Sequence, residues 1–251
     1  MAPDRRGLLR HAALAAMALS LLAVLFTFST VSASPAHAEH TGSSKAWVRV
    51  LHASPDAPPV DILVDNAIAV HALTFGHITK YLGLAAGKAY DIKIAVAGDD
   101  DAVVKELTRV AFNTGYTTVA ATGFVARSPA FSVQVFSDSS WRADSRARIR
   151  VVHLSPGAPA VDVYAKRETS EDASFAKVVS ALSYPHATGY LQVKGGEYQF
   201  GVAAAASSSL VYTSPEVGLL PGRVYTAWAI GSLIGSGQGF RLLVTTDFAA
   251  L

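Results

Sequence analysis

The sequence contains an internal duplication, and this feature constrains the fold more than any other. Residues 48–62 align without a gap on residues 149–163, at a constant offset of 101. A second pair of blocks, 75–82 and 184–191, follows in the same order. Two blocks that recur in the same order indicate a tandem repeat, in which each copy builds the same structural unit. The sequence therefore predicts two copies of one domain.

The extent of each copy follows from its outermost strand signals. Extending each block to the last apolar run before the next break places the first domain at 45–137 and the second at 146–251. Between them lies a polar stretch, 138–145, that contains Trp141. A connection of this length is too short to act as a free tether, so we expect the two domains to be in contact.

Both copies show the periodicity of β-strands. Short runs of apolar and β-branched residues are separated by Gly, Pro, Asn and Asp, and residues 90–96 alternate large apolar with small or polar side chains. The runs of the first copy predict strands near 46–52, 60–65, 67–73, 79–84, 89–96, 102–111, 115–124 and 130–136. This pattern predicts an all-β chain with a β-sandwich of immunoglobulin-like architecture in each copy.

Several segments are predicted to be loops. The second copy has a longer excursion at 166–173, and its alanine-rich run 203–209 is expected to be a loop or an edge ribbon, although alanine favours helices. The acidic turn 98–101 lacks the ligand spacing of a calcium loop and is expected to be a hairpin tip. The glycine-rich run 231–239 lacks the Gly-Lys-Ser/Thr of a phosphate loop.

The amino terminus has the layout of a signal peptide. Three arginines precede an apolar run, 12–28, and the small residues that follow end in Ala36-His37-Ala38, a form that leader peptidases cut. The run is shorter than the roughly 20 residues that span a bilayer, which favours a cleaved leader over an anchor. We therefore expect residues 1–38 to be removed and the protein to meet the membrane only during export.

The export route has two interpretations. Arg5-Arg6 resembles the twin-arginine export signal, although Asp4 stands where those signals prefer Ser or Thr. A general secretory leader with two adjacent arginines fits the same residues. Either route places the mature chain, which starts at Glu39 or less favourably after Ala33, outside the cytoplasm as a secreted or cell-wall protein.

Charge excludes one class of partner. Removing the leader deletes three arginines and one aspartate and leaves 18 basic and 18 acidic side chains. A neutral mature chain lacks the electrostatic footprint of a nucleic-acid binder, so we expect no nucleic-acid partner. The chain has no cysteine, which means that disulfides do not stabilise it.

The repeated blocks resemble a known domain family. The string His-x-Ser-Pro-x-Ala-Pro-x-Val-Asp starts at His52 and again at His153, and an aromatic residue, a threonine and Tyr-Leu follow in each copy. It resembles the DUF4397 domain, a family of bacterial extracellular β-sandwich modules with no established activity. The resemblance covers the mature chain once per copy, and Gly157 in place of Asp56 is one departure. It implies no catalytic residues.

Three polar residue types recur at matched positions of the two motifs and are the candidate site residues. They are His52, Ser54 and Asp61 in the first copy and His153, Ser155 and Asp162 in the second. The prolines of the motif fix φ and remove backbone donors, which stiffens the crossing between strands. A histidine can bond such a crossing through its ring nitrogens, and an aspartate can bond loop amides. The structural interpretation is a hydrogen-bonded corner in each copy.

The same residues have a functional interpretation. A His and an Asp brought together in each copy would bind a metal ion or act as a general-base pair. Four of the six mature histidines are repeat-matched, His52 with His153 and His77 with His186. Because no histidine pair stands at metal-ligand spacing, we predict no catalytic residue, metal or cofactor. The alternative is an extracellular hydrolase or a metal-binding protein that uses the His/Asp pairs.

The favoured function is binding. We expect a secreted or cell-surface, non-catalytic protein that holds a cell-wall polymer, a glycan or a surface protein, in adhesion or in the envelope. Trp47, Trp141, Trp228 and nine tyrosines would line a sugar-binding face or fill the core. An exposed aromatic patch on both copies would favour binding, with affinity raised by linkage. A cleft in which His52 and Asp61 meet would favour the hydrolase.

Overall fold

The computed structural model describes residues 44–140, 145–168, 174–233 and 237–248. The predicted signal peptide lies outside these residues, as do Trp141 and parts of the runs 166–173 and 231–239. Both copies belong to one compact unit, Thr41–Leu251. Among the described residues there is no helix long and apolar enough to span a bilayer.

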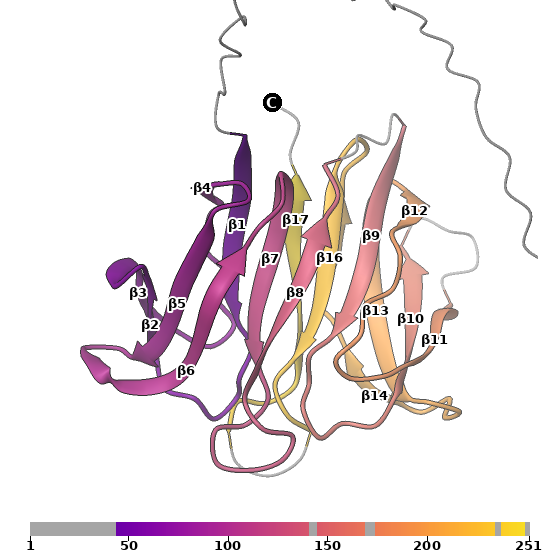
Figure 1. The fold of residues 1–251 in the computed structure, drawn as a ribbon. Helices are drawn as coiled ribbons and strands as arrows, with labels where there is room; N and C mark the ends of the chain where they lie inside the picture. Colours follow the sequence, from indigo (N-terminus) through magenta and orange to yellow (C-terminus); the bar gives the residue numbers. More distant parts are fainter. Residues whose placement is uncertain (1–43, 141–144, 169–173, 234–236, 249–251) are drawn as a thin grey trace, which may run out of the picture. The chain divides into compact units, whose positions relative to one another are not determined.

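The first copy is a sandwich of two four-stranded sheets (Figure 1), with the orders β4-β1-β7-β8 and β3-β2-β5-β6. All the strands predicted for this copy are present. They are β1 (Lys45–His52), β2 (Val60–Val64), β3 (Ala67–Leu73), β4 (Leu82–Ala85), β5 (Ala89–Val96), β6 (Asp99–Ala111), β7 (Gly115–Thr122) and β8 (Ser132–Asp138). Asp138, which the sequence placed in the connection between the domains, is the last residue of β8.

The second copy repeats this architecture, with the orders β12-β9-β16-β17 and β11-β10-β13-β14. The long β6 is replaced by two short strands, β14 and β15, both of which pair with β13. The strands are β9 (Arg146–His153), β10 (Val161–Arg167), β11 (Ala176–Leu182), β12 (Leu191–Lys194), β13 (Gly196–Ala204), β14 (Leu210–Thr213), β15 (Val217–Leu219), β16 (Val224–Ile230) and β17 (Arg241–Phe248).

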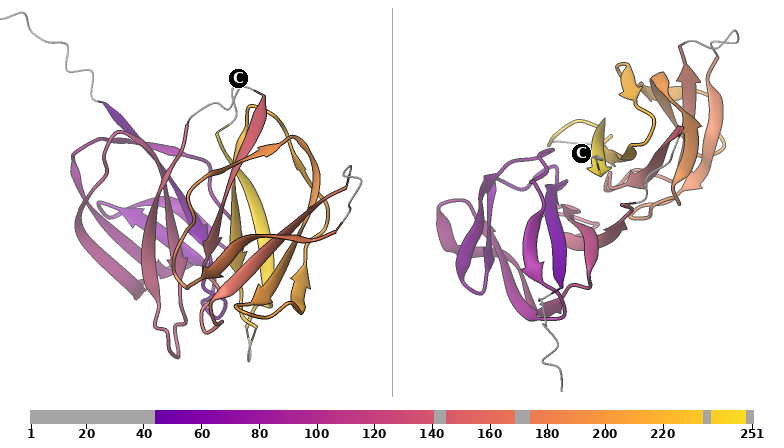
Figure 2. Two further views of the ribbon diagram at one scale, coloured as in Figure 1. Left: turned by 90° about the vertical axis from the view of Figure 1, so that its right-hand side faces the viewer. Right: turned by 90° about the horizontal axis from the view of Figure 1, so that it is seen from above.

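The fold class is confirmed as all-β with two sandwich-like domains, and Figure 2 shows the paired layers of each. The described residues contain no helix, and the run 203–209 ends β13 and continues as a turn and loop. The hairpin tip between β5 and β6 lies at residues 97–98, whereas residues 99–101 of the predicted tip 98–101 begin β6. The immunoglobulin-like detail of the fold stays a prediction.

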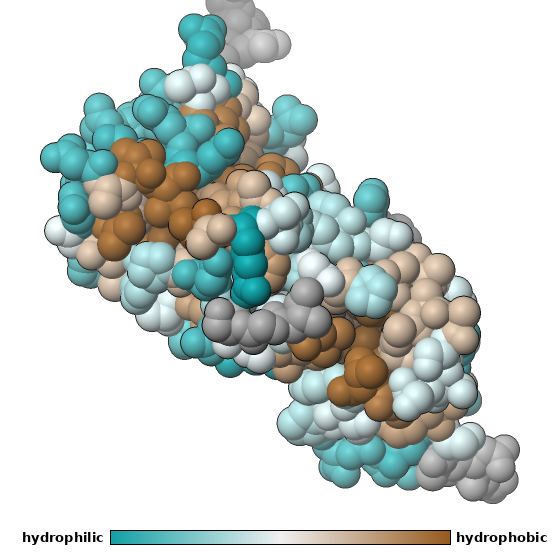
Figure 3. All heavy atoms as spheres, turned by 90° about the horizontal axis from the view of Figure 1, so that it is seen from below, coloured by the Kyte–Doolittle hydropathy of each residue, from teal (hydrophilic) through white to brown (hydrophobic). Residues whose placement is uncertain are grey.

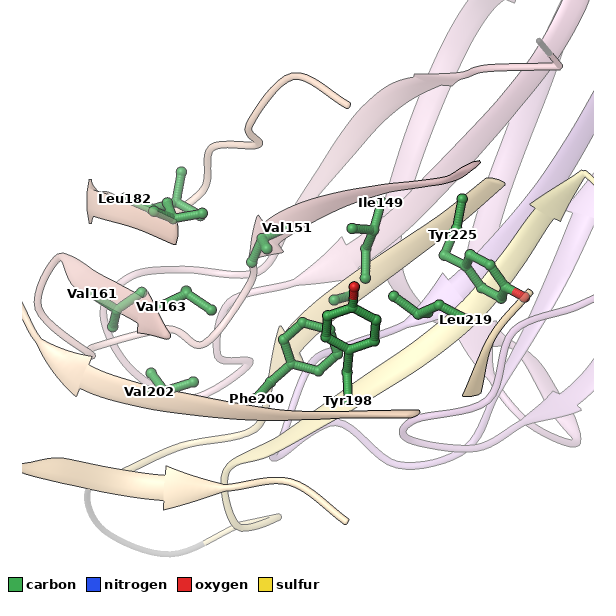
Figure 4. Packing of buried hydrophobic residues seen from close by; sticks show 13 residues of the cluster. Ile149, Val151, Val161, Val163, Leu182, Tyr198, Phe200, Val202, Leu219 and Tyr225 are labelled. Carbon is green, nitrogen blue, oxygen red and sulfur yellow. The ribbon is translucent and has the colours of Figure 1, made fainter. Parts of the chain in front are cut away.

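Alternating side chains build the core of each sandwich. In the first copy, Val48 and Val50 of β1 pack against Ile62 of β2 and Ile94 of β5. Successive side chains of a strand point to opposite faces, so every second residue of these strands enters the core. The second copy packs its core in the same way, and Figure 4 shows Tyr198 and Phe200 rising toward Ile149.

One sheet of each copy is buried on both faces. On β1, Arg49 and Leu51 point away from the sandwich core, yet they are only 3% and 0% exposed. Leu51 belongs to an apolar cluster that draws on both copies and includes Ala120, Val152 and Trp228. The expected contact between the two domains therefore involves β1, β7 and β8 of the first copy and β9, β16 and β17 of the second, whose ribbons fill the middle of Figure 1.

A buried arginine lies at one half of this interface. Arg49 Nη2 donates to Asp247 Oδ1 of the second copy at 2.5 Å, and Nη1 donates to the carbonyl of Thr246 at 3.0 Å. Its Nε donates to Thr118 Oγ1 of its own copy at 2.8 Å. Tyr190 donates its hydroxyl proton to Asp247 Oδ2 at 2.6 Å. The aspartate of one copy is thus bonded by the arginine of the other.

The other half of the interface repeats these contacts with the copies exchanged. Arg150 of the second copy donates to Asp138 of the first, to the Ser137 carbonyl at 2.8 Å and to Thr226 Oγ1 at 2.9 Å. Tyr81 donates to Asp138 Oδ2 at 2.6 Å. The duplicated chain therefore forms a self-complementary contact of the kind that joins the subunits of a two-fold dimer.

The charged side chains of this network are almost completely buried. The side chains of the two arginines are 4% and 5% exposed, and those of the two aspartates 0%. Burial raises the pKa of Asp247, and the Arg49 guanidinium opposes that shift. Burial also raises the pKa of Tyr81 and Tyr190, which keeps both phenols protonated as donors. Such charges are stable only as pairs.

Breaking one pair should therefore destabilise the whole unit. We expect Arg49→Leu to lower the free energy of unfolding by about 3–5 kcal/mol, because Asp247 is left buried without its cation. The double variant Arg49→Leu/Asp247→Leu should lose less than the sum of the two single variants. Urea unfolding measures both effects, with Lys88→Ala, which breaks the exposed pair with Asp65, as the control of small effect. Wild-type stability in Arg49→Leu would show that the Arg49–Asp247 pair does not stabilise the unit.

Candidate functional site

The two motif histidines are buried ends of strands. His52 closes β1 and His153 closes β9, and they are 1% and 0% exposed. Nε2 of His52 lies 3.0 Å from the Pro58 carbonyl, and Nε2 of His153 lies 3.1 Å from the Pro159 carbonyl. A carbonyl oxygen only accepts, so Nε2 carries the proton in both rings. Burial lowers the pKa of both histidines, which keeps the imidazoles neutral.

The two motif serines differ in their partners. Ser54 Oγ donates to the Gly123 carbonyl at 2.7 Å. Ser155 is also fully buried, but its Oγ has no hydrogen-bond partner within the described part of the chain. The backbone N–H of Ser155 instead donates to Nδ1 of His153 at 3.3 Å. Ser54 therefore holds loop backbone, and neither serine contacts the other candidate residues through its hydroxyl.

The two motif aspartates each hold a strained residue of the neighbouring edge strand. Asp61 Oδ1 accepts the N–H of Ala72 at 2.6 Å, and Asp162 Oδ1 accepts that of Ala181 at 2.8 Å. Both alanines have a φ of 49°, in the left-handed region that costs an L-residue free energy. The amide of Ala72 lowers the pKa of Asp61, and the ammonium of Lys177 lowers that of Asp162.

The remaining oxygens of these carboxylates are also occupied. Asp61 Oδ2 accepts the N–H of Gly98 at 3.0 Å, and Asp162 Oδ2 accepts Lys177 Nζ at 2.6 Å. His71 Nδ1 lies 2.9 Å from Asp61 Oδ1. Asp61 therefore ties the start of β2 both to β3 and to the hairpin tip after β5, which is the corner role expected from the sequence.

The structure does not bring the histidine and the aspartate of a copy together. Within the described chain, no hydrogen bond joins His52 to Asp61 or His153 to Asp162, because each is bonded to a different backbone segment. All four are buried. The described residues also contain no group of three or more His, Cys, Asp or Glu that could hold a metal ion. The open His/Asp cleft that the hydrolase alternative requires is absent at both corners.

An aromatic pair on the face of the β4-β1-β7-β8 sheet that also carries Arg49 and Leu51 was not predicted from the sequence. Trp47 of β1 and Tyr116 of β7 are paired in register, and their rings are nearly parallel, at 14° with centroids 6.3 Å apart. Both side chains are half-buried. Tyr81 packs edge-on against Tyr116 at 5.0 Å, and its hydroxyl is held by Asp138 of the interface network.

A small polar cavity borders Tyr116, one of the two rings of this pair. It has a volume of about 250 Å³, and its lining includes Asn113, Thr114, Tyr116, Ser137 and Asp138. The cavity offers hydroxyl, amide and backbone groups next to an aromatic ring. This combination of a few polar groups beside aromatic surface is typical of small-molecule and sugar sites.

The second copy lacks this aromatic pair. The residues paired in register at the matched position are Arg148 and Val224, so this position does not carry the aromatic patch on both copies that would favour binding. Trp228 is fully buried at the contact between the copies and donates to Thr245 Oγ1 at 2.9 Å. The strand register would have revealed the Trp47 pair, but register across parallel strands 69 residues apart is not readable from local periodicity.

The buried histidines should make stability depend on pH. The folded imidazoles have a lowered pKa, so below the unfolded value of about 6.5 the unfolded chain binds more protons. Stability is then complete above pH 6.5 and falls with decreasing pH, by at most about 1.4 kcal/mol per pH unit for each histidine. Urea unfolding from pH 7.5 to 5 should show this loss.

The double variant His52→Gln/His153→Gln is the test of that assignment. The glutamine amides can still donate to the proline carbonyls but do not titrate, so the loss between pH 6.5 and 5 should largely disappear. His77→Gln/His186→Gln, at the exposed matched positions, is the control and should keep the wild-type slope. Asp247 titrates in all three proteins and cancels in the comparison. An unchanged slope in the first variant would show that the corner histidines do not cause it.

The left-handed alanines generate a second prediction. Ala72→Gly and Ala181→Gly should each raise the free energy of unfolding by roughly 0.5–1 kcal/mol, because glycine adopts a φ of 49° without a Cβ clash. Ala69→Gly, in the same strand as Ala72 but at an ordinary φ, should lower it. Thermal unfolding of the three variants measures these differences in stability. A loss of stability in Ala72→Gly would show that the left-handed φ of Ala72 does not cost stability.

Two solved structures resemble the chain weakly. One is a family 26 carbohydrate-binding module from Eubacterium rectale Amy13K in complex with maltoheptaose, with 10% identity, covering 81% of this chain and 98% of that one, at a TM-score of 0.24. The other is a leucine-rich repeat protein from Bacteroides thetaiotaomicron, with 11% identity over 78% of this chain and 27% of that one, at a TM-score of 0.20. Scores this low support no inference about a ligand.

Comparison with protein families is more decisive. No curated protein matches the chain. The model of a domain of unknown function, DUF4397, matches residues 46–164 and 172–250 in succession. The first segment includes both copies of the repeated motif and extends into the second sandwich, and the second segment covers the rest of that sandwich. Together they leave little of the chain beyond the amino-terminal residues unmatched. The chain therefore belongs to the DUF4397 family.

Proposed function

We propose that the protein is an exported, non-catalytic binding module that holds a glycan or a cell-wall polymer against the Trp47–Tyr116 pair. The observation that carries this proposal is the pair itself, with two nearly parallel, half-buried rings beside a polar cavity. A sugar ring has an apolar C–H face that packs on an aromatic ring and hydroxyls at its edge that need donors and acceptors. The pair and the cavity supply both.

The pair is held rigidly, which favours binding. The Trp47 ring lies over Gly83, where a Cβ atom would come within 3.3 Å of it, and Lys45 Nζ lies 5.6 Å from the ring centre. Tyr116 is supported by Tyr81, whose hydroxyl is anchored in the buried network. Side chains that are already ordered lose little conformational entropy when a ligand binds.

The non-catalytic part of the proposal is supported by the corners. The six repeated candidate residues, His52, Ser54, Asp61, His153, Ser155 and Asp162, are all buried. Most of the hydrogen bonds of their side chains run to backbone groups of loops and edge strands, which leaves the repeated motif occupied in building the sandwich. Export rests on the signal-peptide layout of residues 1–38 and places the binding module in the wall or beyond it.

Sedimentation with insoluble polysaccharides tests this function. The chain from Glu39 should co-sediment with purified peptidoglycan, chitin or cellulose, and Trp47→Ala or Tyr116→Ala should weaken binding by roughly tenfold, the worth of one aromatic contact. Arg148→Ala, at the position that matches Trp47 in the second copy, is the control and should bind as wild type.

Two results would overturn the proposal. Equal polysaccharide binding by wild type and both aromatic variants would show that the binding site is not at the Trp47–Tyr116 pair. No binding to any of the polymers would argue for a protein partner. Reducing ends released during the incubation, and lost in His52→Gln, would establish the hydrolase alternative in its place.

A further inference from the structure

We infer that the first sandwich binds a linear aliphatic chain between its two sheets. A cavity of about 300 Å³ lies there, and all fourteen residues that line it are apolar or glycine. Both sheets contribute, with Val48 and Val119 on one side and Ile62, Ile92 and Ile94 on the other. This site is distinct from the aromatic pair, so the inference goes beyond the proposed function and does not depend on it.

The cavity opens along an edge of the sandwich. β3 and β4 are the edge strands of the two sheets at this side, and the lining includes Ala69 and Val70 of β3 and Leu82 and Gly83 of β4. The side chains at the opening are small or exposed, and Leu82 is 36% exposed. Figure 3 shows apolar side chains gathered on the surface of the first copy, at the left. A ligand can therefore enter without unfolding the core.

The second copy, in which β14 and β15 stand in place of β6, has a much smaller space between its sheets. The matched cavity there has only about 50 Å³, although its lining occupies the same strands. Strand register places Phe200 where the first copy has Ile92, and Val178 where it has Ala69. Phe200 stacks on Tyr198 at 6.2 Å and fills the space (Figure 4). Among the described residues, a cavity of this size is thus found in the first copy, and Phe200 in place of Ile92 reduces the matched space in the second.

The chemistry of the lining selects the ligand. No lining side chain can donate or accept a hydrogen bond, so a buried polar group would lose its water without replacement. Apolar cavities of this kind stay dry and take hydrocarbon guests. The volume accommodates roughly ten heavy atoms, if each takes the 30 Å³ of a liquid water molecule. The buried part of the ligand is therefore a short alkyl chain, with its head group at the β3–β4 edge.

Titration with 1-octanol and octanoate tests the inference by calorimetry on the chain from Glu39. We expect saturable one-site binding of 1-octanol that tightens from hexanol to octanol, and a higher melting temperature in its presence. Comparable binding of octanoate would mark a fatty acid as the source of the chain. Tighter binding of the alcohol would mark a neutral lipid. Absence of binding by every probe would overturn the inference.

Variants taken from the second copy locate the site. Ile92→Phe, which copies Phe200, should weaken octanol binding at least tenfold, and Ala69→Val, which copies Val178, should weaken it without altering the deep core. Phe200→Ile is the reverse exchange and should create a second, weaker site. Tyr116→Ala should bind octanol as wild type, and Ile92→Phe should bind polysaccharide as wild type, which separates this inference from the proposed function. Unchanged octanol binding in both filling variants would refute it.

Discussion

The two buried arginine–aspartate pairs determine how the rest of the chain is arranged. Arg49 of the first copy bonds Asp247 of the second, and Arg150 of the second bonds Asp138 of the first. Each arginine also bonds a threonine of its own copy, and each aspartate holds a tyrosine hydroxyl. A buried charge is stable only with its partner in place. The sheets β4-β1-β7-β8 and β12-β9-β16-β17 therefore each depend on the other copy for their native structure.

The residues that the two copies share build the scaffold, and the residues in which they differ create the candidate sites. His52, Asp61 and their counterparts bond backbone groups of loops and edge strands at matched geometry in both copies. Trp47 with Tyr116 occurs in the first copy alone, as does the large apolar cavity. Duplication allows the two copies to differ in this way. The second copy keeps a well-filled core that supports the unit, while the first copy carries the cavity and the aromatic pair.

Local sequence signals were sufficient for the strands and for the role of the corners. Alternation such as that of residues 90–96 reports which side of a strand is buried, and the structure has Tyr90, Ile92 and Ile94 inside. The same rule fails on β1. Alternation would place Arg49 in water, whereas it is 3% exposed, because the outer face of β1 is covered by the second copy. The local sequence pattern of a strand shows which face packs in its own sandwich. It does not show whether the opposite face is covered by another domain.

The sequence by itself determined the duplication, the all-β class and the strand positions, because each depends on local signals within one strand or one loop. Only the tertiary structure decided that Asp138 and Asp247 lie opposite the arginines of the other copy, that Trp47 meets Tyr116, and that a cavity remains beside Ile92. These features depend on register and packing between segments far apart in the chain. A difference of a few carbon atoms, as between Ile92 and Phe200, decides whether such a space is filled.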